Sequence, residues 1–161
     1  QFSPAYRFDG TLGVSNIRQK DAPGVPGEQK TSPSGIFNVT YASETFTAKV
    51  FGSYVYSGGS GFGEATRQWT TGLQVSDQIT REWAWNFSGV YQGSKSVFTS
   101  DTVNLTTYNG TAGLRYQGWE WISLDLTGNL NHQTSDGQLG NTVDNYSAVL
   151  GFTAGKSYKI F

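Results

Sequence analysis

The sequence predicts an all-β fold, with eight antiparallel strands in up-and-down order within one domain that covers residues 1–161. Three observations lead to this prediction. Apolar and polar residues alternate with a period of two along eight segments, no window of similar length shows a helical i, i+3, i+4 pattern, and long connections alternate with short ones. Because successive side chains of a strand point to opposite faces, each segment has one apolar and one polar face.

The first segment runs from Tyr6 to Ser15, where Phe8 and Leu12 alternate with Asp9 and Thr11. Seven more segments repeat this alternation. They are about 35–43 with Phe37 and Val39, 45–57 with Val50 and Tyr54, 64–76 with Trp69 and Leu73, 81–92 with Trp83 and Phe87, 103–117 with Tyr108 and Leu114, 119–133 with Leu124 and Leu126, and 143–160 with Tyr146 and Leu150.

The connections decide how these segments are arranged. Long ones are expected at about 18–34, 57–63, 93–102 and 134–141, and tight turns near residues 43–44, 77–78 and 117–118. In an up-and-down meander, the long loops then share one end, while the short turns and both termini share the other. Several segments reach 12 residues or more, whereas strands of soluble proteins average about 5–6 and a strand that crosses a bilayer needs about 9–11.

Composition excludes several classes of protein. The net charge of −1 provides no basic field for nucleic acid. The absence of cysteine excludes thiolate zinc sites and thiol nucleophiles, and a single histidine, His132, excludes multi-histidine metal sites. No apolar run approaches the roughly 18 residues of a transmembrane helix. No cofactor is expected.

The charges within the predicted strands lie on the polar faces and balance to zero. Three are positive and three negative: Arg7, Asp9, Lys49, Glu82, Arg115 and Asp125. A sealed interior needs paired charges, because an unpaired buried charge is very costly. We therefore expect these six side chains to form an interior ion-pair network, with the apolar face outside. Arg67 falls on the apolar face and is expected near a rim, where its side chain can reach lipid headgroups.

Aromatic residues gather near the expected strand ends. At the short-turn end they are Tyr6, Tyr41, Trp83, Tyr116, Trp119 and Tyr158, and nearer the long loops they are Tyr54, Tyr56, Tyr91 and Tyr108. Two aromatic belts at the membrane interfaces are typical of transmembrane barrels. Together these features predict an eight-stranded antiparallel up-and-down transmembrane β-barrel.

At the level of topology, the whole chain resembles the small eight-stranded outer-membrane barrels of the OmpA and OmpX kind. Phe161 also resembles the C-terminal aromatic of that class, although Lys159 and Ser157, the alternate positions before it, are polar. The resemblance implies a bacterial outer-membrane location, with periplasmic short turns and termini and extracellular long loops. It implies contact with membrane lipid, and a non-enzymatic role as an anchor, structural element or interaction scaffold.

Two alternatives stay open. In a soluble barrel of the lipocalin or avidin kind, Trp69, Trp83 and Trp85 would line a ligand pocket. In a small transport barrel or porin-like assembly, the apolar face would contact other protein subunits. The polar segment with Arg18, Lys20, Asp21, Glu28 and Lys30 is a candidate surface for a protein partner or lipopolysaccharide.

A catalytic reading depends on His132, with Ser135 and Asp136 close by in the sequence. A nucleophile needs a base and an orienting acid in fixed geometry. An inactive polar turn would have the same composition as a catalytic one, so no enzymatic function is expected from the sequence.

Overall fold

The computed structural model describes residues 4–18, 27–57, 65–98, 104–119, 122–136 and 140–155. Eight strands form one sheet in chain order, each antiparallel to the next, which confirms the predicted all-β up-and-down fold. They are β1 (Ala5–Arg18), β2 (Gln29–Ala42), β3 (Phe46–Ser57), β4 (Thr66–Gln78), β5 (Trp83–Ser96), β6 (Asn104–Trp119), β7 (Ile122–Ser135) and β8 (Asn141–Ala154). No helix among the described residues is long and apolar enough to cross a membrane.

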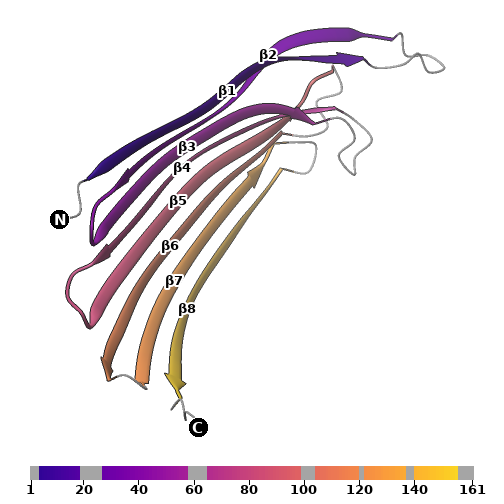
Figure 1. Ribbon diagram of the computed structural model, residues 1–161. Coiled ribbons are helices and arrows are strands. Elements are labelled where there is room, and N and C mark those ends of the chain that lie inside the picture. Colours follow the sequence, from indigo (N-terminus) through magenta and orange to yellow (C-terminus); the bar gives the residue numbers. More distant parts are fainter. Residues whose placement is uncertain are drawn as a thin grey trace, which may run out of the picture.

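The sheet is twisted and curved, with β1 at one edge and β8 at the other (Figure 1). Neighbouring strands contact each other along the whole sheet, whereas no contact joins the described residues of β1 and β8. The sheet therefore has two edges, and its closure into a barrel stays a prediction. The long connections follow β1, β3, β5 and β7 and share one end of the sheet, as the alternation of loop lengths predicts.

The first hairpin is longer than the sequence pattern indicates. Residues 29–34, expected to be loop, pair with Gly13–Arg18 of β1. Pro33 lies opposite Val14 in this extension, while the ladder between β2 and β3 begins only at Gly35. Proline cannot donate a ladder hydrogen bond, but it is tolerated where a strand has a partner on one side only. Strand β5 likewise continues to Ser96, four residues past its expected end.

The register assigns every strand residue to one of two faces. The apolar face consists of the even-numbered residues of β1, β3, β6, β7 and β8 and the odd-numbered residues of β2, β4 and β5, up to a register shift after Tyr116. The remaining strand residues form the polar face.

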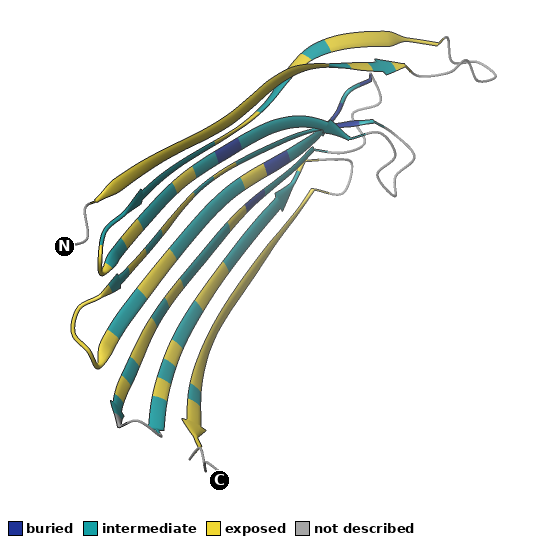
Figure 2. Cartoon of the chain, in the orientation of Figure 1, coloured by how far each residue is buried: buried dark blue, intermediate teal, exposed yellow. Residues whose placement is uncertain are grey.

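Large hydrophobic side chains of the apolar face are exposed rather than packed into a core (Figure 2). Leu12 is 92% exposed, Leu150 75% and Phe8 73%. Among the described residues, Phe98 is the only buried large hydrophobic side chain, and it lies at the loop end with buried Thr66, Ser96 and Thr107. The described part of the chain therefore leaves the hydrophobic surface of this sheet uncovered.

Candidate functional site

The polar face brings four of the six predicted network charges into two separate ion pairs. Arg115 Nε lies 2.8 Å from Asp125 Oδ1 across the ladder between β6 and β7. On β1, Arg7 Nε lies 2.8 Å from Asp9 Oδ2, two residues along the same strand. Each ion pair is formed by near neighbours in the fold. These four charges are therefore matched in two separate pairs, without an extended network.

The other two predicted charges are placed differently. Lys49 Nζ lies 5.5 Å from the centre of the Phe51 ring, and Glu82 lies in the turn before β5 instead of inside a strand. The Glu82 carbonyl accepts a hydrogen bond from the Gln117 amide, which ties this turn to β6. Within the described part of the chain, neither residue lies within salt-bridge distance of an opposite charge.

Uncharged side chains connect the polar face across three strands. Thr111 Oγ1 donates to Asn129 Oδ1 at 3.1 Å, and Asn129 Nδ2 donates to Ser147 Oγ at 3.3 Å. The Asn131 amide also donates to Asn109. These small polar side chains therefore bond to one another across the polar face.

Most predicted interface aromatics form ring pairs on the apolar face. At the short-turn end, ring centres are 4.9 Å apart for Tyr6 and Tyr41 and 4.6 Å for Trp83 and Tyr116. Nearer the long loops, the pairs are Tyr54 with Tyr56 at 5.6 Å and Tyr91 with Tyr108 at 4.9 Å. Trp119 ends β6, and its side chain, like Tyr158 and Phe161, lies outside the described residues.

The three tryptophans of the soluble-barrel alternative do not converge on one cavity. Trp69 packs against Gly93, where a Cβ would come within 2.1 Å of the indole. Trp83 stacks with Tyr116 at the opposite end of β5, ten positions from Gly93. Trp85 lines a separate hollow of about 300 Å³ with Arg115 and Asp125.

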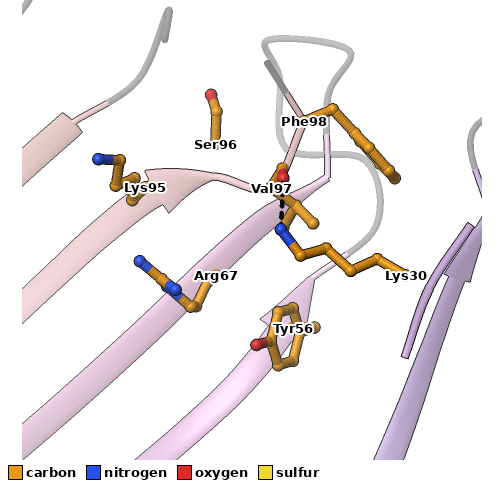
Figure 3. A pocket seen from close by; sticks show the side chains of 7 residues that line it. All are labelled: Lys30, Tyr56, Arg67, Lys95, Ser96, Val97 and Phe98. Carbon is orange, nitrogen blue, oxygen red and sulfur yellow. Dashed lines mark hydrogen bonds between the residues drawn. The ribbon is translucent and has the colours of Figure 1, made fainter. Parts of the chain in front are cut away.

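A basic pocket of about 260 Å³ opens at the loop end (Figure 3). Seven residues line it: Lys30, Tyr56, Arg67, Lys95, Ser96, Val97 and Phe98. Arg67 and Lys95 are register partners on β4 and β5, and Lys30 reaches from β2 to donate to the Val97 carbonyl at 3.4 Å. Among the described residues, the lining contains three cations and no carboxylate. Of the polar segment singled out in the sequence, Lys20 and Asp21 lie outside the described residues.

A second cluster surrounds His132, on the apolar face near the loop end of β7. His132 Nδ1 lies 2.5 Å from Asp144 Oδ1 on β8, and His132 Nε2 lies 3.2 Å from Thr134 Oγ1. The Tyr108 ring lies beside the imidazole, with 5.8 Å between ring centres. Both ring nitrogens of His132 therefore have a partner.

The neighbours suggested by sequence proximity, Ser135 and Asp136, are arranged differently. Ser135 is on the polar face of β7, and Asp136 Oδ2 accepts from Asn104 Nδ2 at 3.2 Å. The hairpin register instead places Asp144 directly opposite His132. The signal in the sequence was His132-X-Thr134, since residues two apart in a strand share a face.

Among the described residues, no group of three or more His, Cys, Asp or Glu could hold a metal ion. Comparison of the chain with models of known families, with curated proteins and with solved structures finds no match. The site therefore has to be interpreted from its own geometry.

Proposed function

We propose that this chain is a β-barrel of the bacterial outer membrane, acting as an anchor and interaction scaffold through its long loops. The observation that carries the proposal is the exposed apolar face, which extends across all eight strands. In water, so large a hydrophobic surface would drive association. Against lipid the same side chains need no protein partner, and the polar face turns inward.

The edges of the sheet support closure in this environment. Strands β1 and β8 each have 14 residues, and no contact joins them within the described chain. A bilayer offers no water to backbone groups, so a lipid-exposed sheet edge has to find a strand partner. An even number of up-and-down strands makes the pairing of β1 with β8 antiparallel, as in single-chain outer-membrane barrels.

The position of the basic pocket fits a barrel whose loop end lies at a membrane interface. Its cations Lys30, Arg67 and Lys95 lie at the loop end, next to the aromatic pair Tyr54 and Tyr56. Aromatic belts lie at headgroup level in membranes, where cations meet anionic lipid. The proposal places phosphate groups of lipids, including those of lipopolysaccharide, in this pocket.

Cysteine cross-linking tests closure, because the chain contains no cysteine of its own. Thr11→Cys on the polar face of β1 is combined in turn with a cysteine at each residue of β8. In lipid, we expect a cross-link within one chain at an odd-numbered β8 position, which shares the polar face, and none at even-numbered positions. The closed protein should also migrate faster on gels before heating than after.

Two results would contradict this proposal. Cross-links found only between two chains would instead support an assembly in which β1 and β8 pair with another subunit. A protein that stays monomeric and folded in plain buffer, with no cross-link at any position, would exclude a membrane barrel.

A further inference from the structure

We infer that Thr134, His132 and Asp144 form an acyl-ester hydrolase site on the apolar face of the sheet. This inference goes beyond the scaffold role proposed above, and only its choice of a lipid ester as substrate rests on the membrane location.

The hydrogen bonds of His132 follow the order of a catalytic triad. An ionised carboxylate can only accept, so Asp144 holds the proton of neutral His132 on Nδ1. Nε2 is then the acceptor, and it faces the Thr134 hydroxyl at 3.2 Å. Acid, base and hydroxyl therefore follow one another in the order that activates a nucleophile.

His132 and Asp144 lie further from the strand ends than the other charged residues of the apolar face. The other charged side chains of the apolar face, Arg18, Arg67, Asp77 and Lys95, lie within two residues of a strand end. His132 and Asp144 are each the fourth residue from the loop end of their strand, 38% and 46% exposed at the side chain. Ionisable groups facing lipid are costly, which makes them candidates for function.

An apolar strip lies beside the site on β7 and β8. Along β7 and β8, successive register pairs below His132 and Asp144 are apolar or small: Leu130 with Tyr146, Gly128 with Ala148, Leu126 with Leu150, and Leu124 with Phe152. This strip is exposed and spans seven residues of β7, or about 23 Å at the rise of a β-strand. It provides a track for an acyl chain whose ester group lies at the hydroxyl of Thr134.

The reaction follows from these positions. Thr134 Oγ1 attacks the ester carbonyl carbon while His132 Nε2 takes the hydroxyl proton. The carbon–oxygen bond to the alcohol then breaks, and His132 returns that proton to the leaving alcohol, which leaves an acyl-threonine ester. Water, deprotonated by His132, attacks this ester and releases the fatty acid and free Thr134. Asp144 acts as a positioning residue through His132.

The test uses the full chain in detergent micelles with p-nitrophenyl laurate as substrate. The comparison substrate is p-nitrophenyl acetate, whose acyl group is too short to lie along the apolar strip. We expect Thr134→Val and His132→Gln to lower kcat/KM for laurate at least about 100-fold. Thr134→Ser should retain hydrolysis, and Thr142→Val, an exposed position opposite Thr134, is the matched control. Asp144→Asn should lower kcat and leave KM unchanged.

Mass spectrometry of wild-type protein quenched during turnover should find the lauroyl group on the peptide that contains Thr134. This measurement needs no variant, so a variant that fails to fold leaves the inference testable. Wild-type hydrolysis no faster than that of folded Thr134→Val, or an acyl group on another residue, would overturn it. The assay takes place in micelles, so its failure is separate from a failure of strand closure in lipid.

Discussion

The two faces of the sheet handle polarity in opposite ways. On the polar face, Arg115 pairs with Asp125 on the next strand and Arg7 pairs with Asp9 on its own. On the apolar face, large side chains are exposed, and Arg67 and Lys95 contribute to a loop-end pocket whose described lining contains no carboxylate. The polar face thus pairs four of its own charges, whereas under the proposed function the apolar face relies on lipid to supply both hydrocarbon and negative charge.

The largest expected effect is the loss of stability when a charge is placed on the apolar face, compared with the same charge on the polar face. Leu126 is 50% exposed on the apolar face of β7, and its neighbour Thr127 faces the polar side. We expect Leu126→Lys to destabilise the protein in lipid by about 2–4 kcal/mol, because a lysine near the bilayer midplane loses its hydration. Thr127→Lys, in the same strand and with the same charge, should cost much less.

Urea unfolding in lipid vesicles measures both variants. If the two lysines cost the same, the faces would have equivalent surroundings, and the inside-out arrangement would be wrong.

The next effect concerns the basic pocket. Replacing Arg67 and Lys95 by glutamine should weaken binding of phosphatidic acid micelles by about 1 kcal/mol for each charge, close to five-fold each. Arg115→Gln removes a cation of the polar face and should leave this affinity unchanged. The measurement is the apparent Kd over a salt titration, and equal losses for all three cations would show that net charge alone controls binding.

The architecture was largely predictable from the sequence. Period-two alternation depends only on which side chains share a face, so it indicated all eight strands, and the alternation of long and short connections indicated their up-and-down order. The limits of the first hairpin were missed because prolines and charges around Pro33 resemble a loop. Residues 29–34 pair with β1 alone, because the ladder to β3 begins only at Gly35. The sequence pattern does not show which side of a strand lacks a partner.

The candidate sites were harder to predict, since they depend on register. His132 and Asp144 are 12 residues apart in the chain and become partners only when the β7–β8 hairpin fixes which residues face each other. Arg67 and Lys95 are likewise 28 positions apart and meet as register partners. Sequence proximity pointed to Ser135 and Asp136. Ser135, however, lies on the polar face, and the Asp136 carboxylate accepts a hydrogen bond from Asn104.

The smallest expected effect is the coupling free energy between paired aromatic rings, beyond what burial of their hydrophobic area contributes. The Trp83 and Tyr116 rings, with centres 4.6 Å apart and planes tilted by 40°, lie at the short-turn end. A double-mutant cycle with Trp83→Leu and Tyr116→Leu should give a coupling of about 0.5–1.5 kcal/mol, beyond the loss of buried area. Tyr91 and Tyr108, 4.9 Å apart with a 42° tilt, are the matched pair near the long loops. Because both pairs join β5 to β6 in the same ladder, one at its short-turn end and one eight register positions nearer the long loops, similar couplings in lipid would support two interfacial belts. Coupling at one end alone would mean that only this end meets a membrane interface.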